Sequence, residues 1–92
     1  MPQVFKVGSY LVYFWSNEGS VLEPVHVHVS EGEPTAFATK IWITSEGRAL
    51  LCSNQSEIPR KQLSIIMRLI EARREDIEKK WVEHFGMLVH YC

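Results

Sequence analysis

Residues 23–29 read Glu-Pro-Val-His-Val-His-Val, and from Val25 to Val29 valine and histidine alternate strictly. Successive side chains of a β-strand point to opposite faces of the sheet, so this period of two places the three valines on one face. His26 and His28 then lie side by side on the other face. We therefore predict a strand here, with a buried valine face and a histidine face opposite it.

The segments around this strand predict further strands joined by short turns. Gly8 and Ser9 separate two runs rich in β-branched and aromatic side chains, and such a pair suits a tight hairpin. Every side chain from Tyr10 to Trp15 is apolar or aromatic, so we expect both faces of that strand to be covered. Short connections of this kind indicate a mostly antiparallel sheet of about five strands. The expected strands are residues 4–7, 10–15, 25–29, 36–44 and 48–52.

The last third of the chain changes to a helical period. Pro59 can open a helix, because a first helical residue needs no free N–H. Apolar side chains then recur at intervals of three and four residues as far as Phe85, and Gly86 is a typical helix stop. Arg73 and Arg74 interrupt the apolar stripe without a glycine or proline, which leaves a helical hairpin, a bent helix and one long helix open. The prediction is an α+β fold with these helices packed on one face of the sheet.

A length of 92 residues with 46% apolar side chains suits a single domain with one packed core. Residues 1–52 would form its sheet part, residues 59–85 its helical part and residues 86–92 a C-terminal arm. No apolar run approaches the roughly 18 residues that cross a bilayer, and the start lacks the pattern of a secretory signal. We expect a soluble, cytoplasmic protein with no membrane partner, in which Cys52 and Cys92 are free thiols.

Charge and apolar surface indicate which partners the protein binds. Residues 1–58 hold three basic side chains against six acidic ones, which is poor provision for the phosphate contacts of general nucleic-acid binding. Arg60, Lys61 and Arg68 share one helical face that can hold phosphates, but we interpret it as a solvated face. The apolar strand, the wide apolar stripe of the first helix and the apolar residues 87–91 exceed what one small core buries. We therefore expect a homodimer when no cognate partner is present.

The histidine strand is the candidate centre for chemistry. One neutral imidazole of His26 and His28 can take the 2′-OH proton of RNA while a protonated histidine or Lys40 supports the leaving oxygen, with no metal. An enzyme of this kind should place Glu18, His26, His28 and Lys40 around one concave site. With Glu18 or Glu23, the same imidazoles can form a two-histidine, one-carboxylate site for a divalent metal; no other cofactor is expected. The third alternative is a solvated strand face, whose histidines bind a partner, satisfy neighbouring polar groups or point outward and take part in no reaction. The three tryptophans lie in apolar runs and are interpreted as core aromatics.

Four segments also carry a family resemblance. Together they resemble the small bacterial proteins catalogued as domain of unknown function 4160, over nearly the whole chain. In that family the histidine box commonly reads Pro-Pro-His-Val-His-Val close behind Ser-Asn-Glu, whereas residues 19–22 lengthen the loop here. The segments are residues 1–5 (Met-Pro-Gln-Val-Phe), 14–18 (Phe-Trp-Ser-Asn-Glu), 24–29 (Pro-Val-His-Val-His-Val) and 81–86 (Trp-Val-Glu-His-Phe-Gly).

Members of this family are often encoded beside another small protein in pairs that resemble toxin–antitoxin modules. The resemblance therefore implies a toxin–antitoxin component with a cognate small protein as its partner. The component would be either an RNA-cleaving toxin that uses His26 and His28 or a non-catalytic protein-binding module.

Overall fold

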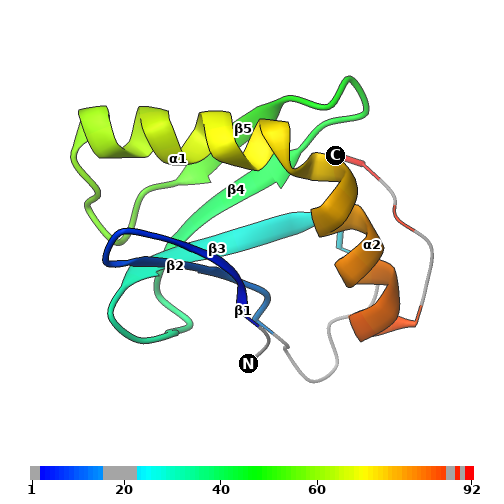
Figure 1. Cartoon of the computed structure of the whole chain (residues 1–92), viewed down its shortest axis with the longest axis horizontal. Helices are drawn as coiled ribbons and strands as arrows, with labels where there is room; N and C mark the ends of the chain where they lie inside the picture. The colour runs from blue at the N-terminus through cyan, green and yellow to red at the C-terminus, as the bar shows by residue number, and fades with distance from the viewer. Residues whose placement is uncertain (1–2, 16–22, 87–88, 90) are drawn as a thin grey trace.

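Five antiparallel strands form one sheet, and two helices follow it, in the computed structural model of the chain (Figure 1). The structure describes residues 3–15, 23–86, 89 and 91–92. The strands lie in the sheet in their sequence order, so each pairs with the next along the chain. This confirms the predicted α+β fold. The elements are β1 (Gln3–Val7), β2 (Tyr10–Tyr13), β3 (His26–Glu31), β4 (Thr39–Ile43), β5 (Ala49–Ser53), α1 (Arg60–Ala72) and α2 (Arg74–Phe85).

Tight turns fold the strands back on one another. Gly8, between β1 and β2, has a φ of +59°, the left-handed conformation for which the hairpin prediction needed a glycine. The histidine strand runs two residues beyond its predicted end, because Ser30 and Glu31 still pair with β2. Residues 36–38, which we expected to begin the next strand, lie outside β4. These differences move strand ends and leave the strand order as predicted.

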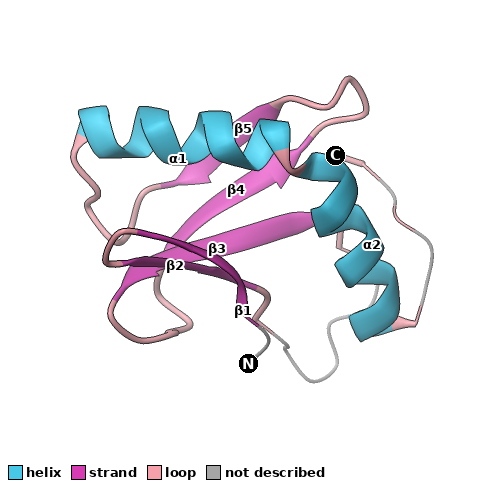
Figure 2. Ribbon diagram, in the orientation of Figure 1, coloured by secondary structure: helices cyan, strands magenta, loops and turns pink. Residues whose placement is uncertain are grey.

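The two faces of the sheet have different neighbours. Helix α1 lies across one face, as Figure 2 shows, and the other face carries no helix among the described residues. Val25, Val27 and Val29 are fully buried under the helices, as the alternation predicts. Strand β2 is covered on both faces, which confirms the interpretation of its apolar run. The main core also includes Val12, Phe14, Ile41, Ile43, Leu63, Ile66, Ile70, Ile77 and Trp81.

The helical part consists of two helices joined at a single residue, Arg73. The chain therefore bends there, and α2 turns to the end of the sheet rather than folding back along α1 (Figure 1). Pro59 precedes α1 instead of opening it, because its ψ of 145° is still extended. Gly86 ends α2 with a φ of +68°, as predicted. Of the expected C-terminal arm, residues 87, 88 and 90 lie outside the described residues.

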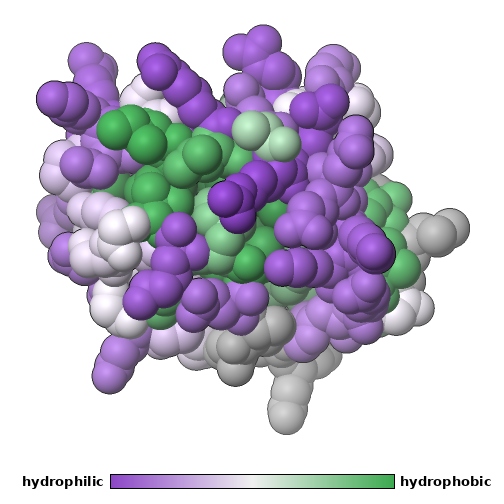
Figure 3. Space-filling model, viewed as in Figure 1, coloured by the Kyte–Doolittle hydropathy of each residue, from purple (hydrophilic) through white to green (hydrophobic). Residues whose placement is uncertain are grey.

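Apolar side chains remain on the surface. Figure 3 shows them gathered on the face that carries α1, within a hydrophilic border. Cys52 and Cys92 are exposed free thiols, as expected. Neither helix in the described part of the chain is long and apolar enough to cross a membrane. The exposed large apolar side chains are Phe37, Leu50, Leu51, Ile65, Val82 and Tyr91.

Candidate acid–base site

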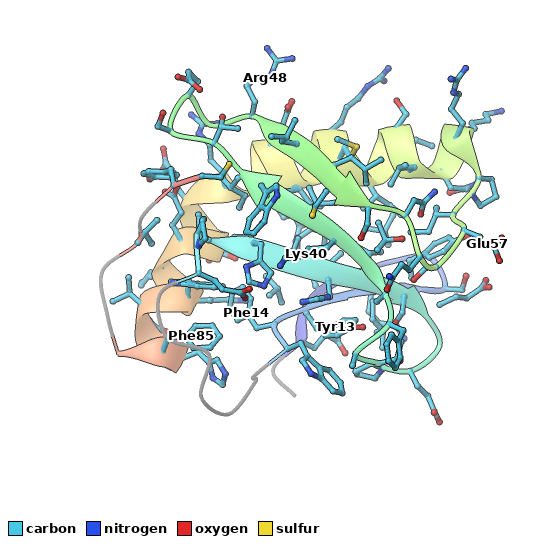
Figure 4. The ribbon with its side chains drawn as sticks, turned by 180° about the vertical axis from the view of Figure 1, so that it is seen from behind. Tyr13, Phe14, Lys40, Arg48, Glu57 and Phe85 are labelled. Carbon is cyan, nitrogen blue, oxygen red and sulfur yellow. The ribbon has the colours of Figure 1, made fainter. Side chains whose placement is uncertain are left out.

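The pairing of β2, β3 and β4 brings the candidate residues together on the helix-free face. His28 lies directly across from Tyr13 of β2 and from Lys40 of β4, and His26 lies across from Trp42. Directly paired residues project from the same face of a sheet, so these five side chains are neighbours. Figure 4 looks onto this face and labels Tyr13 and Lys40. We define the histidine cluster as Glu23, His26, His28 and Lys40.

Glu23 connects two members of the cluster from just before β3. One carboxylate oxygen, Oε1, lies 3.5 Å from Nζ of Lys40, and the other, Oε2, lies 3.6 Å from Nε2 of His26. The Lys40 ammonium also sits 4.4 Å from the ring centroid of Trp42. A carboxylate and an indole face both attract a cation. The ammonium is therefore held in place beside the imidazoles.

His26 is a buried ring with a defined tautomer. Its Nδ1 donates a hydrogen bond to the Pro24 carbonyl at 2.8 Å, so the neutral ring carries its lone pair on Nε2. The rings of Trp42 and Trp81 contact it edge-on, at centroid distances of 5.3 and 5.2 Å. Burial lowers the pKa of His26 below its ordinary value, although the Pro24 carbonyl acts in the opposite direction.

His28 is buried and incompletely hydrogen-bonded. Its ring stacks on Tyr13 at a centroid distance of 5.8 Å and meets His26 edge-on at 5.2 Å. Its Nδ1 is shielded from solvent and finds no hydrogen-bond partner among the described residues. Burial, together with the nearby His26 and Lys40, lowers the pKa of His28 to about 4. An unpaired buried nitrogen is uncommon in folded proteins and calls for an explanation.

The interpretation of this strand face as solvated is therefore wrong. His26 is 4% exposed and His28 is 9% exposed. Aromatic side chains from three other elements cover them: Tyr13 of β2, Trp42 of β4 and Trp81 of α2. Both imidazoles are consequently neutral near pH 7, beside one fixed cation.

The structure assembles only some of the residues that the sequence nominated. His26, His28 and Lys40 come together, and Glu23 joins them. Glu18 lies outside the described residues. Across residues 23–86 and the rest of the described chain, no three His, Cys, Asp or Glu side chains are arranged to hold a metal ion. The two-histidine, one-carboxylate arrangement with Glu23 is therefore not formed.

Three aromatic residues shape the cluster, although we expected them only to fill the core. The predicted strands 10–15 and 36–44 already contained Tyr13 and Trp42, so a correct strand register would have revealed them as neighbours of the histidines. Trp81 comes from α2, more than fifty positions along the chain from His26, and no local pattern points to that contact.

The fold and the cluster define a small α+β domain whose central strand carries a buried imidazole pair beside a lysine. The chain belongs to the family described as Domain of unknown function (DUF4160), whose model matches residues 9–82. This range runs from the start of β2 into α2 and includes the whole histidine cluster. Searches of the curated proteins and of the solved structures gave no match to the chain.

Proposed function

We propose that the protein is the RNA-cleaving component of a toxin–antitoxin pair and that the histidine cluster performs the acid–base chemistry. One observation supports this most: His28 is a neutral imidazole directly across the sheet from the Lys40 ammonium. A neutral base beside a fixed cation is what transfer of a phosphoryl group within RNA requires.

In this proposal His28 takes the proton of a ribose 2′-OH. The freed oxygen attacks the adjacent phosphorus, and the bond from phosphorus to the 5′-oxygen of the next nucleotide breaks. The leaving 5′-oxygen takes up a proton from water, and His28 afterwards returns its proton to the solvent. The products are a 2′,3′-cyclic phosphate and a 5′-hydroxyl. The Lys40 ammonium stabilises the negative charge that develops on the phosphorus oxygens and on the leaving oxygen, and Glu23 holds the ammonium in position.

Burial changes the pH dependence of such a reaction. A pair with one protonated imidazole would give a bell-shaped rate profile between about pH 5 and 8. Here both pKa values are lowered, so Lys40 must take the role of the cation. The rate should therefore stay constant as the pH falls from 7 and decline only near the pKa of His28, at about 4.

The test uses purified protein, EDTA and a defined single-stranded RNA. We expect His28→Ala and Lys40→Ala each to lower the cleavage rate by roughly two to four orders of magnitude, the usual worth of a positioned acid or base. Lys40→Arg should retain part of the activity, since it keeps the charge. The exposed residues His84 and Lys79 provide matched controls, as His84→Ala and Lys79→Ala. Because His28 is buried, the folded fraction of each variant is measured at the assay temperature.

Undiminished cleavage by folded His28→Ala protein would exclude this mechanism. No cleavage by the wild type under any condition would favour the second candidate, a non-catalytic protein-binding module. The half-exposed leucines of the edge strand β5 favour that candidate, since exposed apolar side chains are typical of binding surfaces.

The proposal extends to the setting of the protein. It includes a cytoplasmic location, a cognate small protein encoded nearby and a homodimer when that partner is absent. The exposed large apolar side chains support association. Light scattering at high micromolar concentration should give the mass of a dimer, and a monomer would count against this part of the proposal.

A further inference from the structure

Strand β5 is the last strand of the sheet, and no described strand pairs with its outer edge. The N–H of Ala49 points outward, since it donates to Oε2 of Glu71 at 2.9 Å instead of to β4. The ladder between β4 and β5 is regular from Ala49 to Leu51, so the N–H of Leu51 points outward as well. Leu50 is 50% exposed and Leu51 39%. Exposed apolar side chains and free backbone groups make an edge that can accept another strand.

A groove with a basic rim runs beside this edge, between β5 and α1. Arg48 borders it from the sheet, and its side chain is 75% exposed. This side chain projects away from the molecule in Figure 4. Arg60 and Arg68 border it from α1, and Leu63 and Met67 are apolar parts of its wall. The groove thus combines cationic side chains with an apolar surface along the edge of a strand.

Glu71 shows which group this groove binds. Its Oε2 accepts hydrogen bonds from Nε of Arg48 at 3.1 Å and from the Ala49 N–H at 2.9 Å. These two donors lower the pKa of the Glu71 carboxyl. Arg60 and Arg68 form no ion pair with any residue of the described chain. The groove already holds one carboxylate, and two arginines are left to bind others.

We propose that an extended, acidic segment of a partner protein binds here as a sixth strand next to β5. Its backbone would pair with the outward groups of Leu51, and its carboxylates would bind Arg60 and Arg68. This inference rests on the second candidate function, protein binding, and does not depend on RNA cleavage. The groove lies at the α1 side of the sheet, whereas the histidine cluster lies on the helix-free face.

Charge decides between this partner and a second copy of the chain. Pairing of two β5 edges would bring the exposed cations Arg60, Lys61 and Arg68 of one α1 towards the same cations of the other. Like charges in contact oppose association. Nucleic acid would satisfy the arginines, but phosphates make no use of the exposed leucines or of the outward backbone groups. An acidic β-strand uses all three features.

The binding test measures fluorescence anisotropy of a labelled ten-residue peptide in which valine and glutamate alternate. Three controls isolate its features: the same peptide with glutamine for glutamate, the same peptide N-methylated at alternate residues, and an oligoribonucleotide of equal charge. We expect the glutamine peptide to bind at least fivefold more weakly, because it lacks the carboxylates. We expect the N-methylated peptide to bind at least tenfold more weakly, because it cannot pair with β5.

Variants of the protein locate the site. The double variant Arg60→Ser/Arg68→Ser should weaken binding of the acidic peptide roughly five- to tenfold, the combined worth of two surface ion pairs. The double variant Lys6→Ser/Lys79→Ser removes the same charge from exposed positions outside the groove and should bind as the wild type does. RNA cleavage should be unchanged in the arginine variant, so a failure of peptide binding and a failure of RNA cleavage are measured separately.

Three results would overturn the inference. Equal binding of the parent and N-methylated peptides, with the oligoribonucleotide bound as tightly, would show a surface for polyanions. A wild-type dimer that blocks peptide binding would assign the β5 edge to a second copy. Absence of binding at millimolar acidic peptide would show that the edge does not accept a strand.

Discussion

Acid should destabilise this protein through His28. The pKa of His28 falls from its ordinary value of 6.5 to about 4 in the folded chain, which is roughly a 300-fold loss of proton affinity and corresponds to about 3 kcal/mol. Above pH 6.5 the imidazole is neutral in both the folded and the unfolded chain. Between 6.5 and about 4 only the unfolded chain binds the proton, so the free energy of unfolding decreases as the pH falls.

Lowering the pH from about 7 to 4.5 should therefore remove about 2 to 3 kcal/mol through His28 alone. A domain of this size has a total stability on the order of 5 to 10 kcal/mol, so the loss is large enough to measure. The carboxylates also titrate in this range, and a non-titrating variant separates their contribution. His28→Gln keeps a polar side chain but cannot take up the proton.

The assay is urea unfolding of the wild type and His28→Gln at several pH values between 4.5 and 7.5. The stability of the wild type minus that of the variant should fall by about 2 to 3 kcal/mol across this range. If the difference between wild type and His28→Gln changes by less than about 0.5 kcal/mol, the burial argument for His28 is wrong.

Two further predictions follow from the surroundings of the cluster. Tyr13→Phe removes a hydroxyl that donates to the Thr35 carbonyl at 2.7 Å and accepts from the Thr35 N–H at 2.9 Å. Calorimetry should therefore show a loss of about 1 to 3 kcal/mol in the free energy of unfolding. An unchanged melting temperature would contradict this prediction. Zinc and manganese should bind weakly at most, because Pro24 occupies Nδ1 of His26 and the Lys40 ammonium repels a cation. Submicromolar affinity in a calorimetric titration, lost in His28→Ala, would refute the second prediction.

Much of the fold was predictable because its signals are local. The alternation from Val25 to Val29 determines which side chains face the core, and Gly8 permits the first hairpin. The sequence predicted the strand ends less well. Glu31 continues β3 because it still pairs with Tyr10 of β2, and a turn-like sequence gives no sign of this partner. The sequence also left undecided whether the helix bends at Arg73, because tertiary packing determines that bend.

The candidate site was predictable in its members but not in its environment. The period of two places His26 and His28 side by side, and the strand order brings Lys40 across from His28. Whether the imidazoles meet water depends on rings from β2, β4 and α2, which are brought together only by register and helix placement. The change from a solvated to a buried pair, and with it the lowered pKa values, therefore could not be read from the strand alone.

The sequential order of the strands has a consequence for synthesis of the protein. Each strand pairs with the one before it, so hairpins can form in turn as the chain leaves the ribosome, with little entropy lost in closing loops. Helix α2 is different, because Trp81 contacts His26 and Lys80 donates to the Val4 carbonyl from the other end of the chain. The cover of His26 is thus completed only after nearly the whole chain has been made. A nascent chain would carry an assembled sheet in which His26 lacks the Trp81 ring, and its burial would be completed by the last helix to dock.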